Sequence, residues 1–214
     1  MKSILSSRIL IAVSLTLSAA PSLAGAPIEE IVVTADFRER PANEMPTSVT
    51  VLEADFIEDV AVQHFEELVN LVPNLSWSGD GHRARYFQIR GVGELEQYEG
   101  APNPSVGFLI DDIDFSGIGT VATLFDVGSV EVLRGPQGSR YGANALGGLI
   151  YMRGREPSAE RDGLLRLTMG DDDTRALGVA FGGSLNKSET LLFRLSAQAH
   201  ESNGFRNNSY LGRD

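Results

Sequence analysis

The last quarter of the sequence contains three segments in which apolar residues alternate with polar or small ones. They cover residues 165–169, 177–185 and 191–200, and polar turns at 170–173 and 186–189 separate them. A two-residue period places the apolar side chains of a strand on one face. Such strands fit a membrane-spanning sheet with lipid on one face and water on the other, and they also fit a soluble antiparallel meander. The alternation restricts this region to antiparallel β structure and leaves both environments open.

The first 24 residues have the profile of a secretory signal peptide. Lys2 and Arg8 form a positive start, an apolar run covers residues 9–17, and residues 22–24 (Ser-Leu-Ala) form a small-x-small cleavage site. A membrane anchor is the alternative, but the apolar run is shorter than the roughly 20 residues that a bilayer span needs. We therefore expect export and cleavage after residue 24.

The composition excludes several classes of function. With 18 Lys and Arg against 29 Asp and Glu, the net charge of -11 opposes binding to nucleic acid. The absence of cysteine excludes disulfides, thiolate zinc sites and cysteine nucleophiles. The three histidines are far apart in the sequence, and no catalytic constellation is recognisable. We expect no enzyme, no bound metal and no cofactor.

A β-branched segment follows the expected cleavage site. Residues 28–35 read IEEIVVTA, which has strong strand propensity and no helical period. Residues 36–46 are charged and bounded by prolines, which predicts a flexible tether. The sequence thus indicates a strand near a mobile end, although a first strand of the core is the alternative.

Residues 46–157 predict a small α+β domain. Residues 48–52 alternate as a half-buried strand, and apolar residues spaced at i, i+3, i+4 and i+7 predict a helix that Pro73 ends. This apolar stripe consists of Phe65, Leu68, Val69 and Val72. Further strands are expected at 86–89, 106–110, 129–133 and 149–153, separated by long loops.

Four motifs between residues 29 and 150 resemble the TonB box and plug domain of TonB-dependent outer-membrane receptors. The strongest is VEVLRGPQGSRYGANALGGLI at 130–150. In the same order as in the family, EEIVVTA at 29–35 is similar to the TonB box, QIRGVG at 88–93 to the IRG element, and PSVGFLIDDI at 104–113 to the central hairpin. The similarity favours barrel strands over a soluble meander for the last quarter of the sequence.

The resemblance implies a fold, a domain order and a location. Residues 25–45 carry the TonB box and tether, and residues 46–157 form an α+β plug with a small mixed sheet and short helices. Residues 161–214 supply the first antiparallel strands of an incomplete outer-membrane β-barrel. The receptor would lie in the outer membrane of a Gram-negative bacterium, with the plug and box on the periplasmic side.

The implied partner is TonB with its inner-membrane motor complex. An exposed β-branched segment can bind such a partner by adding a strand to the edge of the partner's sheet. The expected TonB-binding residues are Glu30, Ile31, Val32, Val33, Thr34 and Ala35.

Two arginines are implied to hold the plug inside the barrel. Arg90 in QIRG and Arg134 in RGPQG would pair with carboxylates on the barrel wall, and local salt bridges are the alternative. Gly135, Gly138 and Gly142 predict a compact loop after Arg134, because glycine allows backbone turns that other residues avoid.

Substrate contacts are implied for outward-facing plug loops, with a solvated surface as the alternative. A cationic loop at 78–86 would attract an anionic metal chelate, whereas the acidic segment 94–103 would oppose it. The candidate residues are His82, Arg83, Arg85, Tyr86 and Tyr98.

The length departs from the family. A plugged transporter barrel needs roughly 22 strands, and the sequence after Pro157 has room for about three or four. We expect the front of a larger receptor that imports a ferric siderophore or similar scarce nutrient complex. The alternative is a truncated periplasmic plug module that binds TonB without transport. The short distance between cleavage site and box predicts no domain for direct transcriptional signalling.

Overall fold

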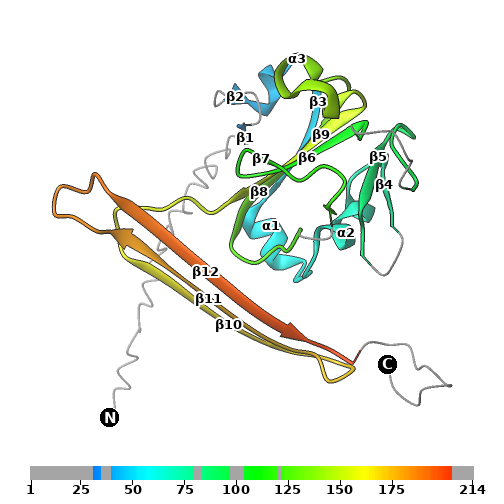
Figure 1. Ribbon diagram of the computed structural model, residues 1–214. Coiled ribbons are helices and arrows are strands. Elements are labelled where there is room, and N and C mark those ends of the chain that lie inside the picture. The colour runs from blue at the N-terminus through cyan, green and yellow to red at the C-terminus, as the bar shows by residue number, and fades with distance from the viewer. Residues whose placement is uncertain (1–30, 35–39, 80–82, 97–103, 120–121, 204–214) are drawn as a thin grey trace, which may run out of the picture. The chain divides into compact units, whose positions relative to one another are not determined.

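A computed structural model describes residues 31–34, 40–79, 83–96, 104–119 and 122–203. The predicted signal peptide lies outside the described residues. A five-stranded mixed sheet organises the first part of the chain (Figure 1), with strand order β3-β8-β9-β6-β7 and one parallel pair, β6 with β9. The bounds are β3 (Ser48–Glu53), β6 (Val106–Ile110), β7 (Ile113–Asp114), β8 (Val127–Arg134) and β9 (Gly148–Gly154). The predicted strands in this region are confirmed.

The larger core lies on one face of this sheet. Alternation along β8 directs Val130 and Val132 to this face, where both are fully buried. Three aromatic rings pack there, with centroids 5.2 Å apart for Phe65 and Phe87 and 5.4 Å apart for Phe87 and Phe108. The elements covering this face are α1 (Ala54–Asp59), α2 (Phe65–Leu68), η2 (Val69–Leu71), β4 (Leu75–Ser78) and β5 (Tyr86–Ile89). The predicted helix is confirmed as α2 and η2, whereas α1 and β4 were not predicted.

A smaller core lies on the other face, where Leu133, Leu149 and Tyr151 are buried together. At the N-terminal end of the described chain, β1 (Val32–Val33) pairs antiparallel with β2 (Arg40–Pro41), and η1 (Ala42–Glu44) follows. The sequence predicts a flexible tether at 36–46, and within it the structure has β2 and η1 at residues 40–44. The pairing of β2 with β1 depends on a contact between two segments, and local composition gives no sign of it.

Tight turns use the residues that the sequence suggests. Asp111 and Asp112 join β6 to β7 with φ of 47° and 67°, which confirms the expected hairpin. Gly135 and Gly142 have φ of +117° and +74°, as their predicted turn role requires. Gly138 instead begins α3 (Gly138–Tyr141), which is followed by η4 (Gly142–Ala145), so the RGPQGSRYG segment is partly helical.

Three long strands form a separate antiparallel sheet (Figure 1): β10 (Asp162–Met169), β11 (Arg175–Ser184) and β12 (Leu192–Glu201). This confirms the predicted strands and turns. One face carries exposed leucines, a valine, a methionine and a phenylalanine, and the opposite face is mostly small or polar. Among the described residues, no helix has the length and apolar character required to cross a membrane.

Candidate functional site

The predicted TonB-binding residues form a short strand that is half exposed. We call residues 31–34 the coupling segment; Glu30 and Ala35 lie outside the described residues. Ile31 and Val32 are 43% and 39% exposed, whereas Val33 is fully buried. The Ala42 amide donates to the Ile31 carbonyl at 2.8 Å, next to the β1-β2 pair. The segment therefore presents two apolar side chains to solvent while its third is held by the protein.

A buried carboxylate accepts hydrogen bonds from the last residue of the coupling segment. The backbone amide and hydroxyl of Thr34 both donate to Oε1 of Glu131, at 2.8 and 2.6 Å. Glu131 is fully buried in the middle of β8 and lies on the same sheet face as the smaller core. Burial, and then the negative charges of Asp112 and Glu131, raises the pKa of Tyr141 to about 12. The hydroxyl of Tyr141 thus stays protonated near this carboxylate.

The two predicted plug-barrel arginines lie near each other. Arg134 is buried and donates to the Pro73 carbonyl (3.2 Å), the Ser48 hydroxyl (3.2 Å) and the Thr50 hydroxyl. Burial, and then the positive charge of Arg90, lowers the pKa of the Arg134 guanidinium. Neither arginine makes a salt bridge to a carboxylate within the described residues.

Arg90 itself sits at a turn and projects outward. Its backbone has φ of 55°, its amide donates to the Asn74 carbonyl at 2.8 Å, and the residue is exposed. A positive guanidinium at the surface, beside a buried second one, leaves an electropositive spot on this part of the plug.

The predicted ligand loop is only partly described. His82 and Tyr98 lie outside the described residues. Arg83 forms an ion pair with Glu66 (2.8 Å), and Nε of Arg85 donates to the Gly117 carbonyl at 3.2 Å. Tyr86 is buried in β5, so its placement in an exposed loop was wrong; the strand starts at this residue and turns its ring inward. The arginines are therefore held in place at the base of the loop.

Two carboxylates fasten the loop ends through contacts that the sequence does not predict. Glu66 at the start of α2 accepts the Ala84 amide at 2.5 Å in addition to Arg83. Glu94 accepts the amide and hydroxyl of Ser105 at 2.9 and 2.7 Å, which joins the two ends of the segment between them. Each is one acid among 29 in the sequence, so no local pattern distinguishes it.

A buried ion pair connects the plug to the three-stranded sheet. Arg194 of β12 binds Asp126 through two hydrogen bonds of 2.6 and 2.8 Å, and the side chains are 7% and 2% exposed. The same guanidinium binds Asp162 of β10 at 2.7 Å. Next to it, Phe125 lies over Gly178 of β11 and under the Arg166 guanidinium, whose carbon is 5.7 Å from the ring centroid. The polar and small-residue face of the sheet therefore contacts the plug.

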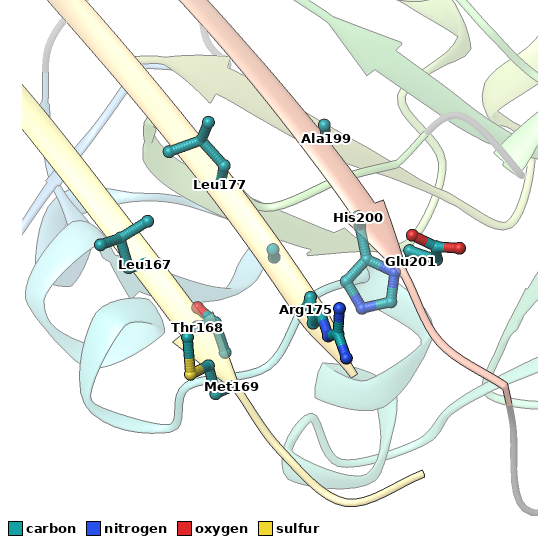
Figure 2. A pocket seen from close by; sticks show the side chains of 9 residues that line it. Leu167, Thr168, Met169, Arg175, Leu177, Ala199, His200 and Glu201 are labelled. Carbon is teal, nitrogen blue, oxygen red and sulfur yellow. The ribbon is translucent and has the colours of Figure 1, made fainter. Parts of the chain in front are cut away.

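An open depression of about 530 Å³ lies at one end of the same sheet. Figure 2 shows Leu167 and Leu177 on neighbouring strands and Arg175 close to His200 and Glu201. Arg175 and Glu201 are register partners at the strand ends, so charged residues replace apolar ones there. Within the described residues, no group of three His, Asp or Glu could hold a metal ion. We assign no ligand to this depression.

Comparison with known proteins identifies the domain. The family profile described as "TonB-dependent Receptor Plug Domain" matches residues 41–149. The chain is 32% identical over 137 residues to the pesticin receptor of Yersinia pestis, covering 63% of this chain and 20% of the receptor. It is 29% identical over 152 residues to the vitamin B12 transporter BtuB of Vibrio vulnificus, covering 67% of this chain and 23% of the transporter. The chain thus spans about a fifth of the length of these relatives.

Solved structures agree with the fold. The ferric yersiniabactin uptake receptor FyuA from Yersinia pestis superimposes with a TM-score of 0.67 and 27% identity, over 82% of this chain and 27% of the receptor. The ferripyoverdine receptor of the Pseudomonas aeruginosa outer membrane gives a TM-score of 0.67 at 22% identity, over 82% of this chain and 23% of that one, which supports the fold alone. The family match, the mixed sheet and the motif order lead to one conclusion: the chain belongs to the TonB-dependent receptors of the Gram-negative outer membrane and carries their plug domain.

Proposed function

We propose that this chain is the gate portion of an energy-coupled outer-membrane transporter that imports a ferric siderophore. The observation that carries the proposal is the coupling segment: a β-branched strand with two exposed apolar side chains, immediately before the plug. A protein in the outer membrane needs a mechanical link to an energised partner. Strand addition to TonB by residues 31–34 supplies that link through backbone hydrogen bonds.

The arginines support a role in holding the gate closed. Arg134 is tied to three oxygens inside the plug, and Arg90 projects from a turn with no carboxylate salt-bridged to it among the described residues. A barrel-wall carboxylate facing Arg90 would gain a charge-assisted hydrogen bond and would fasten the plug. The buried Arg134 would add to the positive electrostatic potential at Arg90.

The proposed substrate follows from charge and from the relatives. Arg83 and Arg85 lie at the base of the loop after β4, where an anionic chelate would be attracted. The yersiniabactin and pyoverdine receptors are named for ferric siderophores, whereas BtuB is named for vitamin B12. Glu66 neutralises much of the positive charge of Arg83.

Binding of the periplasmic C-terminal domain of TonB tests the coupling role. The wild-type chain should retain this domain in a pull-down, and Val32→Pro should abolish retention, because proline removes an amide donor and prevents strand pairing. Ser158→Pro, in an exposed loop remote in sequence, is the matched control and should bind like wild type. Equal binding by the Val32→Pro variant would show that residues 31–34 are not the TonB box.

The single tryptophan provides a test of the ligand. Trp77 lies on β4, one residue before the end of that strand and close in sequence to the candidate loop. Ferric yersiniabactin, ferripyoverdine and vitamin B12 should be titrated separately, with the iron-free siderophores as controls for absorbance. Saturable quenching by a ferric siderophore supports the proposal, and quenching by vitamin B12 alone would contradict the siderophore assignment.

A further inference from the structure

The contact between Thr34 and Glu131 joins two places 97 residues apart in the chain. Both donors of Thr34 point to one carboxylate oxygen, and that carboxylate is fully buried. Hydrogen bonds to an ionised acceptor are about twice as strong as neutral ones, and a buried carboxylate requires donors. Thr34, at the end of the coupling segment, is thus among the hydrogen-bond donors to the buried Glu131 carboxylate.

The same contact occupies backbone that a partner strand would use. Strand addition pairs the amides and carbonyls of the bound segment with the edge of the partner's sheet. In this structure the Thr34 amide is bonded to Glu131, the Ile31 carbonyl accepts from Ala42, and the Val33 side chain is buried. The Thr34 amide therefore cannot pair with another strand while its bond to Glu131 persists.

We propose that Glu131 is the positioning residue that sets how much of the coupling segment is available to TonB. The proposal rests on the proposed function, since it assumes that residues 31–34 are the TonB-binding strand. Glu131 and TonB compete for the Thr34 amide. The apparent dissociation constant of the chain for TonB therefore equals the intrinsic constant divided by the fraction of molecules in which the coupling segment is released from Glu131. Weakening the Glu131 contact increases that fraction and tightens apparent binding.

Glu131→Gln tests the proposal without altering the segment that TonB reads. Glutamine keeps the size and one acceptor oxygen but loses the charge, so both Thr34 hydrogen bonds weaken. We expect the apparent dissociation constant of the full chain for the C-terminal domain of TonB to fall about tenfold. Amide hydrogen exchange in residues 31–34 should accelerate by a similar factor.

Glu94→Gln is the matched control. Glu94 also accepts an amide and a hydroxyl from one residue, Ser105, but it lies far along the chain from the coupling segment. This variant should leave both the affinity for the TonB domain and the exchange in residues 31–34 unchanged. A tenfold gain in both variants would indicate general loosening of the plug and would overturn the proposal.

A synthetic peptide of residues 28–39 tests the TonB-box assignment separately from the role of Glu131. If the peptide binds the TonB domain but Glu131→Gln changes neither affinity nor exchange, Glu131 does not hold the segment and the present proposal fails. If the peptide does not bind, the TonB-box assignment fails, while hydrogen exchange still reports whether Glu131 retains Thr34. If Glu131→Gln fails to fold, Thr34→Val replaces it as the test. A peptide with the same change measures how the substitution alters binding to TonB directly. After that effect is subtracted, the affinity of the Thr34→Val chain for the TonB domain must rise at least threefold.

Discussion

The five-stranded plug sheet and the three-stranded sheet β10–β12 are both built from alternating strands, but they cover their apolar side chains differently. Val130, Val132 and Ile150 of the plug sheet are fully buried under helices and a second pair of strands. Leu165 and Leu167 of β10 remain 67% and 69% exposed. The same two-residue pattern therefore fixes which side chains share a face, and the surroundings decide what covers that face.

The buried polar side chains of the two regions also differ in what they contact. In the plug, Glu131 and Arg134 of β8 are buried and hydrogen-bonded within the domain. In the three-stranded sheet, Arg194 reaches out of its own sheet to Asp126 of the plug. The apolar face of β10–β12 suits contact with lipid, as in outer-membrane barrels, and its polar face suits contact with the plug.

The largest effect is expected for Phe108→Ala in the plug. Phe108 is 1% exposed and packs against two other aromatic rings, so its removal should lower the free energy of unfolding by about 4 kcal/mol. Phe181→Ala on β11, where the side chain is 48% exposed, should cost less than about 1.5 kcal/mol. Urea unfolding of both variants in the same detergent measures the difference, and equal losses would refute the contrast between the two regions.

The next largest effect is expected for Arg194→Met. It should lower the free energy of unfolding by about 3 kcal/mol, because it leaves the buried Asp126 carboxylate without its bidentate partner. Adding Asp126→Asn should restore a large part of the loss, since the double variant has no unpaired buried charge. Thermal unfolding of the single and double variants forms a double-mutant cycle. Additive effects would mean that the two residues do not interact in solution.

Gly178→Ala should lower the free energy of unfolding by about 1–2 kcal/mol. A methyl group there would overlap the Phe125 ring, which must then move off the polar face of the sheet. Gly163→Ala on the neighbouring strand is the matched control, because its nearest atom would be the Ala180 carbonyl oxygen at 3.7 Å. The same unfolding assay should find Gly163→Ala within about 0.5 kcal/mol of wild type.

The smallest effect on stability is expected for Leu167→Ala. The side chain is already exposed, so the free energy of unfolding should change by less than about 0.5 kcal/mol. Partitioning into phospholipid vesicles should nevertheless weaken by at least about threefold, since apolar surface that contacts lipid is removed. Unchanged partitioning would argue against a lipid-facing role for this side of β10–β12.

Much of the fold was readable because its signals are local. Alternation located β3, β5, β6, β8, β9 and β10–β12, and the apolar stripe from Phe65 located α2 and η2. Helix α1 was missed because only Ile57 of its six residues is buried, which leaves no apolar period to detect. The strand β2 was missed because its formation depends on pairing with β1 and not on its own composition.

Part of the candidate site could also be predicted, because some of its signals are local in the sequence. The β-branched coupling segment and the two arginine motifs are contiguous in the sequence, whereas their contacts are not. Thr34 meets Glu131 across 97 residues, and Arg134 meets Thr50 across 84. No sequence pattern shows that these acceptors lie beside these donors, so the contacts of Glu131, Glu66 and Glu94 emerged only from the structure.

Site-specific photocrosslinking in whole cells tests the coupling role most directly. A photoreactive amino acid at Val32, whose side chain is 39% exposed, would report which protein contacts the coupling segment in the native outer membrane. Our account predicts an adduct with TonB from position 32 and none from position 158. The absence of a TonB adduct at position 32, or equal adducts from both positions, would contradict the assignment of residues 31–34 as the link to the energised inner membrane.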